Sequence, residues 1–348
     1  MAEFYALQPP VAEGKKEIVF GDSRDRRQDL IMVGKLAEKG LPKTVWLDAS
    51  GEQVLAVVGK RGTGKSFTLG VLLEGLCLKE PNRNLARITT QRGVILFDTL
   101  GVFWTMAYKL QPEGPEKMVE QYKNLEGWDF TPIDLNVDVW VPAGSKLDRV
   151  DPGFFNTFYV NVSDLTAADW ATLLDVDLVT EPRGQLINEA WLRVVQNGWR
   201  HGDDFRPPKP EYAIQDLVEC IRGDDDIQAQ YTDETRRAVV QRLMAYSRYE
   251  MMRASGTRLT ELIKPGRLSV LLVNRLEDNL RAVVSSVIIR KVMYERMRAS
   301  FITKRLKTDP TLSEAERKAL SEQNSTTLPR TWIAVDEAQN LVPAERKT

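Results

Sequence analysis

Residues Gly59–Ser66, with the sequence GKRGTGKS, match the phosphate-binding pattern G-x-x-x-x-G-K-[ST]. The apolar, β-branched run Val54–Val58 before it predicts a buried strand, and Phe67–Leu76 after it predicts a helix with an apolar face. Glycines let such a loop turn its N–H groups toward phosphate oxygens, and the N-terminus of the next helix attracts the same anion. The context therefore predicts a nucleoside triphosphate site rather than a glycine-rich turn without a ligand.

The pattern gives each residue type in the loop a role. Lys65 would reach the β- and γ-phosphates and act in catalysis, while Ser66 would bind Mg²⁺ through its hydroxyl. The candidate nucleotide-binding residues are Gly59, Lys60, Arg61, Gly62, Thr63, Gly64, Lys65, Ser66 and Phe67.

A second acidic feature lies near the end of the sequence. The apolar run Thr331–Val335 predicts a strand and is followed by Asp336 and Glu337. Asp336 would hold the Mg²⁺ through water, and Glu337 would be the catalytic carboxylate that polarises water for attack on the γ-phosphate. Two adjacent carboxylates at a strand end repel each other unless a cation lies there. Together with the phosphate loop, this pair favours an ATPase over a solvated acidic turn.

Composition narrows the class of partner and compartment. The 348 residues contain 48 Lys and Arg against 49 Asp and Glu, so nucleic acid would need a local basic surface. Two such clusters are Arg236–Arg242 and Lys304–Lys307, although charged helix faces are more often simply solvated. Two cysteines and one histidine argue against a disulfide framework or a zinc site. The sequence has no secretory signal and no apolar run long enough to span a membrane, so it predicts a cytoplasmic protein without a membrane partner.

Strand and helix patterns alternate along most of the chain, which predicts an α/β fold with a mainly parallel sheet. Further strands are expected at 31–33, 44–47, 94–98, 138–142 and 268–273. The expected organisation is a short β-rich N-terminal segment at 1–50, a first core part at 51–162, a helical insertion at 163–262 and a second core part at 263–348.

Four segments resemble the HerA family of the HerA/FtsK ATPases, over roughly residues 50–348. They are the loop and helix start Gly59–Val71, the strand Val94–Gly101, the turn and strand Lys264–Val270, and the acidic Val335–Gln339. Thr63 replaces the serine usual in the family's loop, a conservative change where binding is through backbone N–H groups.

The resemblance implies a RecA-like core that binds ATP and Mg²⁺ and assembles into hexameric rings that move double-stranded DNA through the pore. It also implies an ATP site between neighbouring subunits, completed by an arginine of the next one. Family members work with nucleases in DNA end processing, or with nuclease or sirtuin-like effectors in defence against phage.

Two departures from the family pattern accompany this resemblance. The N-terminal β-barrel is reduced, which affects docking of partners there. The polar sensor and the arginine finger usually follow the acidic strand, so we expect the natural chain to continue, and this stretch to bind ATP but hydrolyse it poorly alone.

Two other functions remain open. The ring would serve equally as an ATP-gated platform that organises an effector without moving DNA, because both functions need the same nucleotide site. A GTPase-type switch is the other, since Asp98–Gly101 fits D-x-x-G and Ser145–Asp148 approaches N-K-x-D. A GTPase would leave Asp336 and Glu337 without a role.

Overall fold

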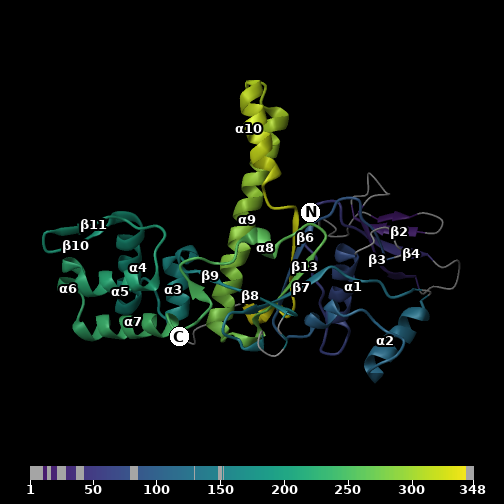
Figure 1. Cartoon of the computed structure of the whole chain (residues 1–348), viewed down its shortest axis with the longest axis horizontal. Coiled ribbons are helices and arrows are strands. Elements are labelled where there is room, and N and C mark those ends of the chain that lie inside the picture. The colour runs from purple at the N-terminus through teal and green to yellow at the C-terminus, as the bar shows by residue number, and fades with distance from the viewer. Residues whose placement is uncertain are drawn as a thin grey trace, which may run out of the picture.

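A parallel five-stranded sheet forms the centre of the computed structural model, which describes residues 11–13, 17–21, 29–36, 43–78, 85–128, 130–147, 151 and 153–341 (Figure 1). The strand order is β14-β6-β13-β7-β8, and every neighbouring pair is parallel. The predicted α/β class is confirmed, as are the predicted strands at its centre. Their bounds are β6 Gly93–Asp98, β7 Val137–Pro142, β13 Leu268–Leu272 and β14 Thr331–Val335, and β8 Phe155–Phe158 at the edge of the sheet was not predicted.

Helices cover both faces of this sheet because successive side chains of a strand point to opposite faces. On one face, Phe97 lies in the same core as the apolar side of α9 (Asp278–Thr308) and much of the helical region. On the other, Leu96 packs in the core that holds α1 (Lys65–Cys77). The strands are therefore almost continuously apolar, as buried parallel strands are.

The prediction of a strand at Val54–Val58 is wrong. The segment has no regular structure, and Val54 and Val58 are 97% and 90% exposed. Its β-branched residues favour an extended chain, but a strand also needs a neighbour that accepts its backbone hydrogen bonds. Among the described residues, β14 pairs with β6 and no backbone hydrogen bond joins β14 to this segment.

The N-terminal segment forms a second sheet with the order β1-β2-β4-β3-β5. Its fifth strand comes from residues 86–87, beyond the first fifty residues, and pairs antiparallel with β3. The two strands predicted in this segment correspond to β3 and β4. The bounds are β1 Val11–Glu13, β2 Glu17–Phe20, β3 Leu30–Lys35, β4 Thr44–Asp48 and β5 Ala86–Arg87.

Helices dominate the chain between β8 and β13, on the opposite side of the central sheet from the N-terminal strands (Figure 1). The helices are α3 Ala167–Leu174, α4 Pro182–Leu192 with a π-helical end at Arg193–Asn197, α5 Ile214–Gly223, α6 Asp225–Gln230, α7 Asp233–Tyr246 and α8 Leu259–Leu262. Two short pairings accompany them: β9 (Val160–Asn161) with β12 (Met252–Arg253), and β10 (Trp199–His201) with β11 (Asp204–Arg206).

A helical arm projects from the body where α9 continues beyond the sheet and α10 (Glu314–Ser325) returns along it (Figure 1). Ser313 and Glu316 form a capping box at the start of α10, in which each side chain accepts from the backbone N–H of the other residue. The remaining α-helix, α2 (Glu116–Glu126), lies on the same side of the central sheet as the N-terminal strands (Figure 1). No helix in the described ranges is both long and apolar enough to cross a membrane.

Candidate functional site

The candidate site lies at the carboxyl edge of the central sheet. Strands β6 and β14 are parallel neighbours, so the acids that follow them, Asp98 and Asp336, come to the same edge. Ligands of open parallel sheets bind at this edge because loops and helix N-termini converge there.

The phosphate loop has the backbone that its sequence predicts. Gly62 and Gly64 adopt φ values of 80° and 87°, a left-handed region that costs glycine little. Inside the loop, Thr63 Oγ1 donates to the Lys60 carbonyl at 2.7 Å. Helix α1 then starts at Lys65 with no side-chain cap, so the N–H groups of its first turn are available to an anion.

The two halves of the predicted site meet here, although 270 residues separate Ser66 from Asp336. The Ser66 hydroxyl donates to Asp336 Oδ1 at 3.1 Å, and Lys65 Nζ lies 3.9 Å from Glu337 Oε1. Lys65 also donates to the Lys60 carbonyl at 3.2 Å. A hydroxyl, an ammonium and two carboxylates therefore face one another beside a helix N-terminus.

Asp336 fits a magnesium ion. It is buried, and its Oδ2 has no hydrogen-bond partner among the described residues. Burial raises the pKa of Asp336, opposed by the hydrogen bond from Ser66 and helped by the charges of Asp98 and Glu337. A cation would compensate that burial and repulsion, and hydroxyl and carboxylate oxygens are the ligands Mg²⁺ prefers.

Asp98 serves the loop that follows β6. Its Oδ1 accepts from the N–H groups of Leu100 and Gly101 at 3.2 and 2.6 Å, and its Oδ2 accepts from Phe103 at 2.8 Å. Burial raises the pKa of Asp98, while these hydrogen bonds oppose the rise. The Asp98 carboxylate and the Gly101 N–H of the D-x-x-G pattern satisfy each other, so the GTPase interpretation loses support. Asp148, from the second GTPase pattern at Ser145–Asp148, lies outside the described residues.

Two polar residues that were not among the predicted site residues complete the edge. Thr99 Oγ1 donates to the Asp336 carbonyl at 3.0 Å, and Asn340 Nδ2 donates to Thr99 Oγ1 at 3.1 Å. The signal in the sequence was a polar pair, Asp98 and Thr99, at the end of an otherwise apolar strand. Nothing local marked Asn340, because its partner is 241 residues away.

The other predicted residues of the phosphate loop are exposed to solvent, whereas some of the basic residues proposed for nucleic acid form ion pairs. Lys60, Arg61 and Phe67 are exposed at the loop, with Phe67 77% exposed. The basic residues proposed for nucleic acid are partly engaged within the fold. Arg237 pairs with Asp233 at 2.7 Å, and Arg305 pairs with Asp309 at 3.2 Å.

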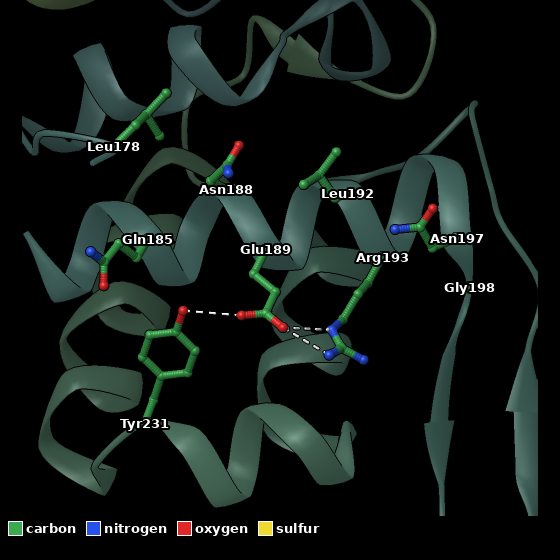
Figure 2. A pocket seen from close by; sticks show the side chains of 9 residues that line it. All are labelled: Leu178, Gln185, Asn188, Glu189, Leu192, Arg193, Asn197, Gly198 and Tyr231. Atoms are coloured by element: carbon green, nitrogen blue, oxygen red, sulfur yellow. Dashed lines mark hydrogen bonds and ion pairs between the residues drawn. The ribbon is translucent and has the colours of Figure 1, made fainter. Parts of the chain in front are cut away.

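A separate pocket of about 590 Å³ lies in the helical region, along α4 and its π-helical end (Figure 2). Glu189 is central to it and accepts from Tyr231 Oη at 3.0 Å and from Arg193 at 2.7 and 3.2 Å. Arg193 also pairs with Asp224 at 3.0 Å. The charged groups of the lining thus satisfy one another, and none of the predicted nucleotide-site residues lines this pocket.

The family model described as helicase HerA, central domain, matches residues 31–292, which include the phosphate loop and most of the central sheet. A search of curated proteins gave no match.

Proposed function

Because the chain belongs to the helicase HerA central-domain family, we propose that it is the ATP-driven motor of a ring-shaped DNA translocase. The family indicates an ATPase of the HerA/FtsK type with a P-loop core, and nucleotide use, usually with Mg²⁺. The single observation that carries the proposal is the 3.1 Å contact between Ser66 and Asp336. It joins the phosphate loop to the acidic strand end, the pairing that metal-dependent triphosphate hydrolysis needs.

Each side chain then has a chemical role. Lys65 binds the β- and γ-phosphates, with the N–H groups of the loop and of α1 around it. Ser66 and Asp336 hold Mg²⁺, which neutralises charge on the phosphate oxygens when bound. Glu337 orients the attacking water and accepts its proton. Lys65 and Glu337 lie 3.9 Å apart, close enough for a γ-phosphate bound by Lys65 to meet the water that Glu337 orients.

The proposal extends to assembly and partners through the family resemblance. We propose a hexameric ring with an ATP site between subunits, double-stranded DNA as the moving substrate, and a nuclease or sirtuin-like effector as partner. The exposed phosphate loop supports the shared site, since a neighbouring subunit has access to it. The second candidate is an ATP-gated platform that organises the effector while DNA stays still.

A nucleotide hydrolysis assay on the full-length protein tests the core of this proposal. We expect Mg²⁺-dependent hydrolysis of ATP in preference to GTP, lost in Lys65→Ala because the phosphate-binding charge is gone. Lys117→Ala, which removes an exposed lysine of α2, is the matched control and should hydrolyse ATP normally. Hydrolysis that survives Lys65→Ala would refute the site.

Double-stranded DNA separates the two candidate functions. A motor should hydrolyse ATP several times faster when DNA is added, because translocation consumes ATP. A platform should show the same rate with and without DNA while still hydrolysing ATP and binding its effector.

A further inference from the structure

Glu337 has an unusual backbone conformation for its residue type. Its φ is 50°, in the left-handed region that a residue with a long side chain rarely adopts. Such a conformation persists only where the surrounding structure holds it, and it recurs at functional sites. Since the Glu337 side chain is the one that would orient water, whatever holds this backbone also aims the carboxylate.

The peptide between Asp336 and Glu337 is held from its carbonyl side. The Asp336 carbonyl accepts from Thr99 Oγ1 at 3.0 Å. Because the carbonyl and the N–H of Glu337 share one rigid plane, fixing this oxygen restricts the φ rotation of Glu337. One residue further on, the Glu337 carbonyl accepts from the Asn340 N–H at 2.8 Å, so both flanking peptides are tied down.

The Thr99 hydroxyl is itself oriented. It accepts from Asn340 Nδ2 at 3.1 Å, which leaves its proton for the Asp336 carbonyl. Thr99 is buried, so water does not compete for these bonds. Three N–H groups of the loop that contains Thr99 donate hydrogen bonds to the Asp98 carboxylate, and these bonds fix the loop. A chain of hydrogen bonds therefore runs from the end of β6 to the turn after β14.

We propose that Thr99, with Asn340, is a positioning residue for ATP hydrolysis, which aims the Glu337 carboxylate by fixing the peptide that precedes it. This inference rests on the proposed function. Neither residue touches the Glu337 carboxylate, whose partners among the described residues are Gln339 at 2.6 Å and Lys65 at 3.9 Å. Thr99 consequently affects the chemical step and leaves the phosphate loop, which binds nucleotide, unchanged.

Thr99→Val tests this in the full-length protein, because valine keeps the shape and removes the hydroxyl. We expect kcat for ATP to fall about ten- to a hundredfold, the scale expected for a misplaced catalytic group. The KM and the Kd for ATP should stay within about twofold. Thr99→Ser restores the hydroxyl and should recover kcat to within about threefold of the wild type.

A matched control and a second variant keep the result interpretable. Thr105→Val also removes a threonine hydroxyl, one that is exposed and bonded to the Val102 carbonyl, and should leave kcat unchanged. If Thr99→Val does not fold, Asn340→Ala serves instead, since it removes the amide that orients the hydroxyl and should lower kcat in the same way.

The two proposals fail in different ways. Wild-type kcat in Thr99→Val, or an equal loss of kcat in Thr99→Ser, would overturn the positioning role while the ATPase assignment stands. A rise in KM with unchanged kcat would also overturn it. If the wild-type protein hydrolyses no ATP and Lys65→Ala leaves ATP binding unchanged, the proposed function fails and the positioning role fails with it.

Discussion

Lys65 connects the phosphate loop to the acidic end of β14 through its charged side chain. Its ammonium lies 3.2 Å from the Lys60 carbonyl and 3.9 Å from Glu337. A triphosphate would compete for the same ammonium with a larger negative charge, and so release Glu337 toward water. The Lys65 side chain would therefore link nucleotide binding to the freedom of the carboxylate proposed to orient water.

Replacing Glu337 by Gln separates binding from hydrolysis. The amide keeps the size of the side chain but does not accept a proton from water, so turnover should fall by about 10² or more. ATP affinity should stay near the wild-type value because Lys65 and the loop are intact. Equilibrium binding of a fluorescent ATP analogue and steady-state hydrolysis by the full-length protein measure the two effects. Glu120→Gln, at an exposed site on α2, is the control. Turnover near wild type would assign the role to another group.

Glu74 makes stability depend on pH. Burial raises its pKa from 4.5 to about 7, so the native state holds a proton that the unfolded state releases near pH 4.5. Stability should fall as pH rises from about 4.5 to about 7, and then level off.

Glu74→Gln removes the titrating carboxyl, and with it this contribution to the pH dependence of stability. The variant should gain stability relative to wild type between pH 5 and pH 8, by on the order of 2–3 kcal/mol for a shift of this size. Urea unfolding at the two pH values measures it, with exposed Glu120→Gln as the comparison. An unchanged difference at both pH values would show that Glu74 is solvated in the native state.

At the scale of elements, local sequence patterns predicted most of the residues that the fold brings together at the candidate site. The loop Gly59–Ser66 and the strand ends at Asp98 and Asp336 carry compact signals, since each depends on neighbours in sequence. Val54–Val58 carried an equally good strand signal and is not a strand, because pairing depends on a distant edge. Asn340 and strand β5 were missed for the same reason: their partners, Thr99 and β3, are remote in the chain.

The π-helical end of α4 gives the helical region a buried electrostatic network. Arg193 lies in this turn and pairs with Asp224, whose side chain is 1% exposed and also caps α6 by accepting from the Ile227 N–H. Arg193→Met would leave that carboxylate buried and unpaired, which should destabilise the fold by about 3 kcal/mol.

Chemical unfolding followed by circular dichroism measures that loss. Asp226→Asn is the matched control, because Asp226 pairs with the same arginine but its side chain is 69% exposed. The control should lose less than about 1 kcal/mol, as exposed ion pairs do. Equal effects of the two substitutions would show that burial of Asp224 does not set the strength of this network.

At the scale of the whole molecule, the candidate site is open to a neighbour. The phosphate loop is exposed from Gly59 to Gly64, and Phe67 beside it is 77% exposed. Monomeric sites usually enclose most of their ligand, whereas this one offers phosphate-binding groups on an accessible surface. A second subunit that covers the nucleotide would complete the enclosure and make assembly depend on ATP.

We therefore expect the full-length protein to form a closed ring, a hexamer, in the presence of ATP and Mg²⁺. Head-to-tail contacts use two different surfaces of each subunit, and they close into a ring only when the rotation between subunits suits it. ATP should favour closure because its γ-phosphate would bridge Lys65 of one subunit and an arginine of the next. Light scattering with and without nucleotide measures the particle mass, and Lys65→Ala should lose the nucleotide-dependent increase. A monodisperse monomer at micromolar concentration, unchanged by ATP or DNA, would overturn both the motor and the platform.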